Sequence, residues 1–164
     1  MLIEHLKRRA EDIVLPKGSS LFYQDYYPRK YTIDARIAIE QGVPREGFRV
    51  QRFDMYFDRV RPRKKGEVLP TTRRARTRLD LRKGYLIADA LFILESQKDG
   101  ALYLYALEQV NGHEIKRVAE QMKRHVEALS LGSLGEMLGV EKSHRVLLIF
   151  EKEQCMRGVQ ERLR

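Results

Sequence analysis

Two acidic side chains, Asp89 and Glu108, interrupt stretches of otherwise apolar sequence. A carboxylate inside a buried strand loses its hydration, so it needs a charged partner, a metal ion or a raised pKa. If residues 97–100 form the loop of a four-residue hairpin, the antiparallel register sets Asp89 directly opposite Glu108. Opposed side chains in such a pair have Cβ atoms about 4.5–5.5 Å apart, near enough for two carboxylates to hold one divalent cation. We therefore predict a cation site at these two residues.

Further polar residues are expected close to this pair. Asp54 or Asp58, on the preceding predicted strand, is a candidate for a third oxygen ligand. In the helix predicted downstream, a rotation of about 100° per residue sets Gln121 and His125 on one border of the apolar stripe. From there both side chains can reach the edge of the sheet where the carboxylates lie. The alternative interpretation, that these two residues form the ordinary polar margin of an amphipathic helix, stays open.

The net charge of +9 is concentrated in residues 59–83, because the rest of the chain carries equal numbers of basic and acidic residues. Each Lys or Arg near a phosphate releases condensed counterions, so a concentrated basic segment is typical of proteins that bind a phosphate backbone. Arginine dominates the segment, and its planar fork suits phosphate oxygens. A solvated loop that only aids solubility is the alternative. The predicted DNA-binding residues are Arg59, Arg61, Arg63, Lys64, Lys65, Arg73, Arg74, Arg76, Arg78, Arg82 and Lys83.

Composition limits the class of protein. The 164 residues are about the length of one domain, so we expect a single domain over residues 1–164. One cysteine, Cys155, excludes an internal disulfide framework and a cysteine-cluster zinc site, and it fits a reducing compartment. No apolar run reaches membrane-spanning length, and residues 1–9 carry charges where a secretion signal is hydrophobic. We therefore expect a cytoplasmic protein that does not contact membranes.

Hydrophobic periodicity and turn signals predict a mixed α/β fold. The expected elements, in chain order, are a helix over 2–14, a tyrosine-rich loop over 21–31, a helix over 33–41 capped by Thr32, a strand over 48–60 with a bulge near Arg52, strands over 85–94 and 102–110, a helix over 115–129, a strand over 145–150 and a terminal helix over 155–163. Ile33 and Ile37 are expected to face the core. Residues 1–30 and 152–164 thus flank a predicted core over 31–151.

The order helix, three strands, helix, strand, with one acid in the second strand and another in the third, resembles the core of the PD-(D/E)XK nuclease superfamily. The two acids of that superfamily bind magnesium, so the resemblance implies a restriction-endonuclease-like αβββαβ core with Mg²⁺ or Mn²⁺ at Asp89 and Glu108. Some branches place further polar groups on the next helix, and there Gln121 and His125 would complete a catalytic site.

The chain departs from the superfamily where a lysine is usual, because Val110 stands at that position. Lys116 or Lys123 is conceivable as a migrated replacement, although the helical wheel sets both on the side away from the carboxylates. The missing lysine favours a DNA-binding protein that has lost nuclease activity over an active metal-dependent deoxyribonuclease, and the second hypothesis stays open.

A closer resemblance is to the replication-relaxation family of plasmids and other mobile elements, in which Asp89, Gly100, Glu108, Gln121 and His125 occupy characteristic places. The similarity covers roughly residues 31–151. It implies a DNA-binding accessory protein of replication, relaxation or mobilisation. The implied partners are DNA and a relaxase or replication protein, with a homodimer also conceivable. A protein-interaction scaffold with a basic segment is the remaining alternative, but it leaves the opposed acids unexplained.

Overall fold

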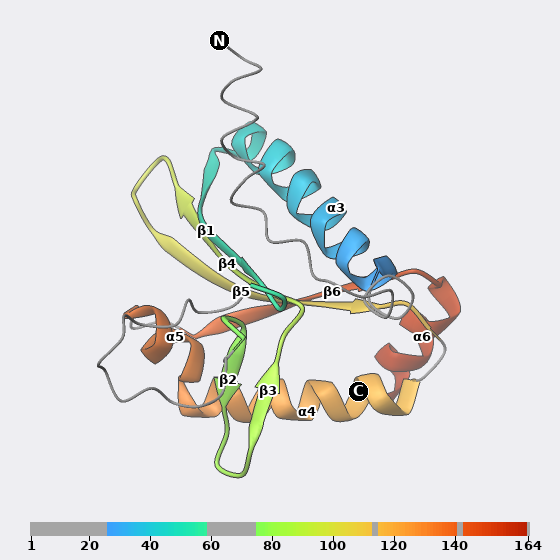
Figure 1. Ribbon diagram of the computed structural model, residues 1–164. Helices are drawn as coiled ribbons and strands as arrows, with labels where there is room; N and C mark the ends of the chain where they lie inside the picture. Colours follow the sequence, from blue (N-terminus) through green and yellow to red (C-terminus); the bar gives the residue numbers. More distant parts are fainter. Residues whose placement is uncertain (1–25, 59–74, 113–114, 141–142, 164) are drawn as a thin grey trace, which may run out of the picture.

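A four-stranded mixed sheet forms the centre of the protein (Figure 1). The computed structural model describes residues 26–58, 75–112, 115–140 and 143–163. The strands of the sheet lie in the order β1 (Phe48–Met55), β4 (Ala90–Ser96), β5 (Leu102–Val110) and β6 (His144–Phe150). The strand β4 is antiparallel to both β1 and β5, and β6 runs parallel to β5. The predicted mixed α/β class is confirmed.

Helices cover both faces of this sheet, as Figure 1 shows. They are α3 (Tyr26–Gly42), the short 3-10 helix η1 (Val43–Glu46), α4 (Ile115–Leu131), α5 (Ser133–Leu138) and α6 (Glu153–Arg162). The helix α3 lies on one face and α4 on the other. Two parallel neighbours need a long crossover connection, which α4 and α5 provide between β5 and β6. Each helix in the described ranges is too short or too polar to cross a membrane.

The first described helix begins earlier than predicted. Thr32 is not its N-cap but a buried residue in its interior, where the hydroxyl donates a hydrogen bond to the carbonyl of Pro28 at 2.9 Å. Pro28 is compatible with this start, because a proline in the first turn lacks only an N–H that has no helical partner. Ile33 and Ile37 are 41% and 46% exposed, so the predicted inward face was wrong. The helix turns Thr32, Ala35 and Ile39 inward instead.

The apolar run over 85–94 forms two strands rather than the single strand predicted. Its first part is β3 (Tyr85–Ile87), which pairs with β2 (Arg78–Asp80) in a separate two-stranded sheet. The chain then leaves that sheet at Ala88 and Asp89 and enters β4. Asp89 therefore lies at a junction between two sheets, where its backbone carbonyl accepts a hydrogen bond from Tyr56 N–H at 2.9 Å.

The hairpin of β4 and β5 has the predicted register. Ala90 is paired with Leu107 and Glu95 with Leu102, and the same register one residue earlier sets Asp89 opposite Glu108. The predicted bulge in β1 is also confirmed, since the pairing with β4 shifts between Val50 and Arg52. That strand ends at Met55, earlier than predicted.

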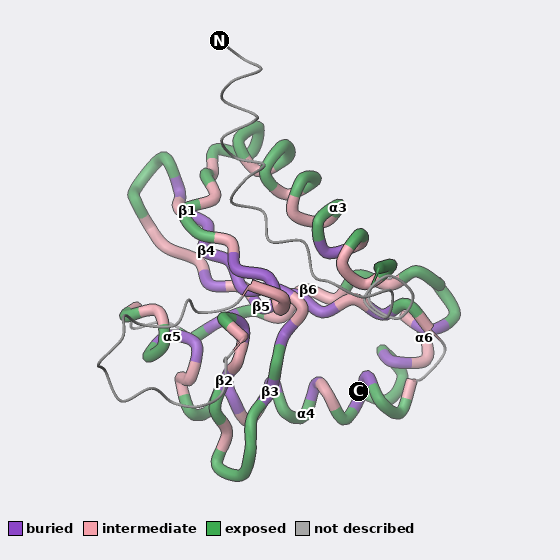
Figure 2. Tube along the Cα trace, in the orientation of Figure 1, coloured by how far each residue is buried: buried purple, intermediate pink, exposed green. Residues whose placement is uncertain are grey.

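The strand β4 is buried on both faces, whereas β5 is buried on the face toward α4 and mostly half-buried on the face toward α3 (Figure 2). The face toward α4 packs Leu91, Ile93, Leu104 and Ala106 in one cluster with residues of β2, β3 and α5. On the opposite face, toward α3, a row of side chains crosses all four strands. It consists of the guanidinium of Arg36 on α3, the stacked rings of Phe53, Phe92 and Tyr105, and the guanidinium of Arg145 on β6. Ring centroids in the row lie 5.2 and 4.9 Å apart.

The remaining predicted elements lie toward the two ends of the chain. The helix predicted over 2–14 lies outside the described residues, as do residues 21–25 of the tyrosine-rich loop. The rest of that predicted loop was wrong, because residues 26–31 form the first turns of α3. The terminal helix is present as α6 and the preceding strand as β6. Three described elements are absent from the helices and strands predicted above: η1, β2 and the short helix α5. The strand β2 lies inside residues 59–83, the segment expected to be a basic hairpin or loop.

Candidate functional site

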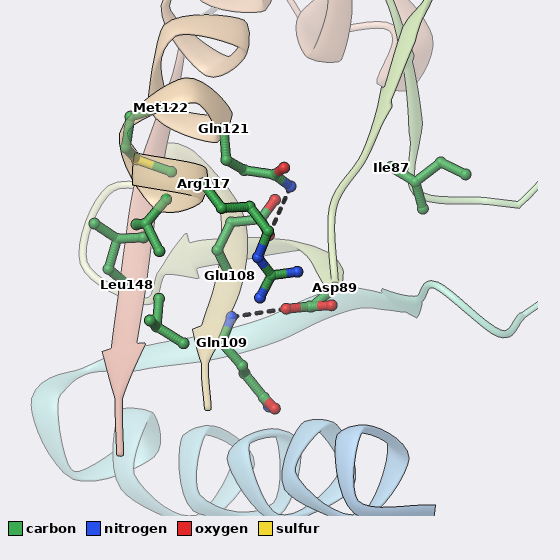
Figure 3. A pocket seen from close by; sticks show the side chains of 10 residues that line it. Ile87, Asp89, Glu108, Gln109, Arg117, Gln121, Met122 and Leu148 are labelled. Atoms are coloured by element: carbon green, nitrogen blue, oxygen red, sulfur yellow. Dashed lines mark hydrogen bonds between the residues drawn. The ribbon is translucent and has the colours of Figure 1, made fainter. Parts of the chain in front are cut away.

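A small pocket lies where β4 begins, against β5 and the first half of α4 (Figure 3). Its volume is about 130 Å³. Its walls carry two acidic, two amide and one basic side chain among apolar ones. The lining residues are Ile87, Asp89, Glu108, Gln109, Val110, Arg117, Val118, Gln121, Met122 and Leu148. Both predicted acidic ligands thus line the same pocket.

Glu108 is the buried centre of this pocket. Alternation along β5 points it to the same face as Leu104 and Ala106, toward α4. Its two carboxylate oxygens contact different side chains of that helix: His125 Nε2 lies 2.7 Å from one oxygen, and Gln121 Nε2 donates to the other at 3.1 Å. Because Gln121 and His125 are four residues apart, one turn of α4 separates them. The predicted convergence of these two residues on the carboxylates is confirmed for Glu108.

The Asp89 carboxylate is held by a backbone hydrogen bond. Its carboxylate accepts a hydrogen bond from Gln109 N–H at 2.7 Å, across the β4–β5 hairpin. Burial, followed by repulsion from the Glu108 carboxylate, raises the pKa of Asp89 from 3.8 to about 6. The hydrogen bond and the positive charge of Arg117 act in the opposite direction but do not outweigh these two causes. The two carboxylates therefore repel each other across the pocket.

Arg117 is a pocket residue that was not predicted from the sequence. It projects from the first turns of α4 toward both carboxylates, as Figure 3 shows. Its position one turn before Gln121 could have revealed it, since side chains four apart on a helix share a face. The two lysines considered instead, Lys116 and Lys123, are exposed and do not line the pocket. Lys123 pairs with Glu120 at 2.7 Å.

The predicted third oxygen ligand is absent from the pocket. Asp54 is buried, but its carboxylate contacts the guanidinium groups of Arg52 at 2.6 Å and Arg76 at 3.3 Å. Asp58 instead accepts a hydrogen bond from Met55 N–H at 2.8 Å, which closes the turn after β1. Through the described ranges, no group of three or more His, Cys, Asp or Glu side chains is placed to hold a metal ion. Any cation here would rest on two carboxylates.

A second buried histidine extends this polar cluster. The rings of His125 and His144 have centroids 6.0 Å apart, and both residues are buried. Burial, with a smaller effect of His125, lowers the pKa of His144 from 6.5 to about 4, so its ring is neutral at physiological pH. Among the described residues, His125 Nδ1 and His144 Nε2 have no hydrogen-bond partner.

The structure describes only the end of the predicted basic segment. Arg59, Arg61, Arg63, Lys64, Lys65, Arg73 and Arg74 lie outside the described residues. Arg76 pairs with Asp54, and Arg78 contacts Asp80 at 3.0 Å while its guanidinium lies 4.1 Å from the centre of the Tyr85 ring. Arg82 and Lys83 are exposed at the tip of the β2–β3 hairpin. The backbone N–H of Arg82 donates to the Glu127 carboxylate of α4, which ties this tip to the helix.

Val110, which stands where the PD-(D/E)XK superfamily has a lysine, borders both the pocket and an apolar cluster. Val110 packs in a buried cluster with Val118, Cys155 and Val159 at the contact of β5, α4 and α6. Within the described residues, Arg117 is the one basic side chain that lines the pocket.

Comparisons with protein-family models, curated proteins and solved structures find no match to this chain.

Proposed function

We propose that this protein binds DNA and holds a divalent metal ion between Asp89 and Glu108. The observation that supports the metal site is the repulsion between two carboxylates in one pocket, expressed in the raised pKa of Asp89. Desolvated acidic groups of like charge cost stability unless a cation neutralises them. Their oxygens are the ligands that Mg²⁺ prefers, and Mg²⁺ commonly takes only one or two carboxylates and keeps several waters.

The DNA-binding part of the proposal rests on charge. The net charge of +9 falls within residues 59–83, and this segment leads directly into the strands that border the pocket. A nuclease-like fold agrees with the strand order β1, β4, β5, β6 and with a β2–β3 hairpin inserted before the second strand of that sheet. In this proposal the protein serves as an accessory in replication, relaxation or mobilisation of plasmid-like DNA, with a relaxase or replication protein as its partner.

Metal-dependent hydrolysis of phosphodiester bonds is a second candidate, and Arg117 is the observation that favours it. The pocket combines two carboxylates with a guanidinium, a glutamine amide and, behind Glu108, a histidine. In this candidate Arg117 would bind a phosphate oxygen, Gln121 and His125 would hold Glu108 in place, and Asp89 and Glu108 would carry the ion. A bound Mg²⁺ lowers the pKa of a coordinated water and polarises the phosphate.

The metal site is tested by stability in the presence of Mn²⁺. Free Mn²⁺ about tenfold above its dissociation constant is expected to raise the free energy of unfolding by about 1.4 kcal/mol. The double variant Asp89→Asn with Glu108→Gln keeps the shape of both side chains and is expected to lose this effect. A control, Asp34→Asn with Glu40→Gln on exposed positions of α3, removes the same charge and should respond like the wild type. Equal responses of all three proteins would contradict the site.

The same proteins separate the two candidates in a nicking assay. Cutting of supercoiled plasmid by the wild type in Mg²⁺ or Mn²⁺, and its loss in the double variant, would establish hydrolysis. Metal binding without cutting would support the accessory role.

The basic segment is tested by the salt dependence of DNA affinity. Alanine at Arg73, Arg74, Arg76 and Arg78 is expected to weaken binding roughly tenfold or more near physiological salt. It should also flatten the plot of log affinity against log salt by about 0.9 for each phosphate that the variant no longer neutralises. Fluorescence anisotropy of a labelled duplex measures both quantities. A charge-matched control replaces the exposed Lys98, Lys116, Lys123 and Arg157. If both quadruple variants lose the same slope, the segment has no special part in binding.

A further inference from the structure

The β2–β3 hairpin has one buried face and one face that presents large side chains to solvent. Register pairs Arg78 with Ile87, Leu79 with Leu86, and Asp80 with Tyr85. Leu79 and Leu86 are almost fully buried in the cluster beneath α4 and α5. Alternation then points the other two pairs outward together, so that Arg78, Asp80, Tyr85 and Ile87 form one continuous surface. We refer to these four residues as the outer hairpin face.

The two large apolar side chains of this face are exposed to solvent. Tyr85 is 48% exposed and Ile87 is 40% exposed, although adjacent Leu86 is 1% exposed. The guanidinium of Arg78 lies over the Tyr85 ring, 4.1 Å from its centre, in a cation–π contact. An arginine plane on an aromatic ring is a platform on which a further flat group can stack.

The outer hairpin face is continuous with the acidic pocket. Ile87 belongs both to this face and to the pocket wall, and Asp89 follows two residues later in the chain. Arg82 and Lys83 are exposed at the far end of the hairpin, and Arg117 lines the pocket at the near end. A polyanion running from the pocket along the hairpin would therefore meet positive charge at both ends and an aromatic ring between them.

We propose that the outer hairpin face binds single-stranded DNA by stacking an unpaired base against Tyr85 and Ile87. This inference rests on the proposed function, because it assigns the kind of DNA that the pocket receives. Bases within a duplex have their faces covered by neighbours, so only an unpaired base offers its flat surface to an exposed tyrosine. Single-stranded DNA is thus expected to bind along the hairpin, while duplex DNA contacts the basic side chains alone.

One negative charge on this face opposes a phosphate backbone. Asp80 is exposed and contacts Arg78 at 3.0 Å, so the charge of that guanidinium is partly neutralised. Exposed ion pairs are weak, and a phosphate can compete with Asp80 for Arg78. The variant Asp80→Asn leaves the stacking surface intact and removes the repulsion, so it is expected to bind single-stranded DNA more tightly than the wild type. Weaker binding by this variant would count against the proposed path of the strand.

The stacking contact can be detected directly by the fluorescence of an introduced tryptophan, because the chain contains no tryptophan of its own. The variant Tyr85→Trp introduces a single indole on the hairpin, and Tyr27→Trp introduces one at a comparably exposed position of α3, which covers the opposite face of the main sheet. An oligothymidylate of about 16 nucleotides is expected to quench the first indole and leave the second unchanged. The same oligomer without bases should quench neither. Lack of quenching of the hairpin indole at saturating oligonucleotide would overturn the proposal.

Affinity provides the second readout. Tyr85→Ala is expected to weaken binding of the labelled oligothymidylate by roughly five- to hundredfold and to change duplex affinity less than about twofold. Anisotropy with the wild type serves as the reference for DNA binding of either kind. If the wild type binds DNA but Tyr85→Ala binds both forms as well as the wild type does, the stacking proposal is wrong while the proposed function stands. If the wild type binds neither form, both are wrong.

Discussion

Replacement of Asp89 by asparagine is expected to stabilise the protein by about 3 kcal/mol at about pH 8 in metal-free buffer. The amide oxygen of asparagine can still accept the hydrogen bond from Gln109 N–H, so the variant loses the charge and keeps the hydrogen bond. A single exchange that stabilises a fold by this amount is unusual, because most substitutions destabilise. The expectation follows from the pKa of Asp89, which rises to about 6 on folding.

The pH range in which Asp89→Asn stabilises the protein follows from the rise of the Asp89 pKa on folding. The folded protein favours the neutral carboxyl, so the penalty for ionised Asp89 is fully present above about pH 6 and disappears as the pH falls toward 3.8. His144 behaves in the opposite way. Its pKa is lowered to about 4, so the stability that it contributes above pH 6.5 is lost as the pH falls toward 4. Over most of this range the two contributions nearly cancel.

In the Asp89→Asn variant, the effect of His144 protonation on stability should therefore no longer be cancelled. We expect the wild type to change little in stability between about pH 6.5 and 4 through these two groups, and Asp89→Asn to lose about 3 kcal/mol over the same interval. Urea unfolding of both proteins across this range measures the difference, in which groups shared by the two proteins cancel. Curves that run parallel from pH 8 to pH 4 would show that the pocket does not shift the pKa of Asp89.

Replacement of Glu108 by alanine is expected to destabilise the protein by about 3 kcal/mol near pH 7. The change removes the acceptor for Gln121 and leaves the ring of His125 buried beside a cavity. Relief of the repulsion on Asp89 opposes this loss but does not restore the two hydrogen bonds. Glu108→Gln retains the shape and an acceptor oxygen, so we expect it to lose less than half as much.

Urea unfolding again provides the measurement, with Glu120→Ala as the control. Glu120 lies on the exposed side of the same helix and pairs with exposed Lys123, so its loss should change stability little. If Glu108→Ala proves as stable as this control, the hydrogen bonds with His125 and Gln121 do not hold α4 to the sheet.

Features that depend on short stretches of sequence were predictable. The hairpin register follows from one four-residue turn and one alternating pattern, so the opposition of Asp89 and Glu108 was accessible without coordinates. The placement of Gln121 and His125 on one side of α4 follows from helical spacing, and their contact with Glu108 was one of two interpretations that the sequence left open.

Features that depend on tertiary packing were not predictable in the same way. The sequence does not reveal that the strand predicted over 85–94 is interrupted at Ala88 and Asp89, because both parts of this apolar run form strands. The interruption arises from the pairing of β3 with β2. The predicted inward face of α3 was wrong because Thr32, Ala35 and Ile39 turn inward, while Ile33 and Ile37 are exposed. That Arg117 lines the pocket depends on how α4 packs on the sheet, which helical spacing does not determine.

The row of stacked rings on the α3 face bears on the acidic pocket on the other side of the sheet. Phe92 and Tyr105 are register partners in β4 and β5, the same two segments whose alignment sets Asp89 opposite Glu108. Sliding one strand by a single residue would swap every side chain to the other surface and break the stack at the same time. The aromatic row thus stabilises the β4–β5 register. Substitutions in the row should change the distance between the Asp89 and Glu108 carboxylates, although none of its residues lines the pocket.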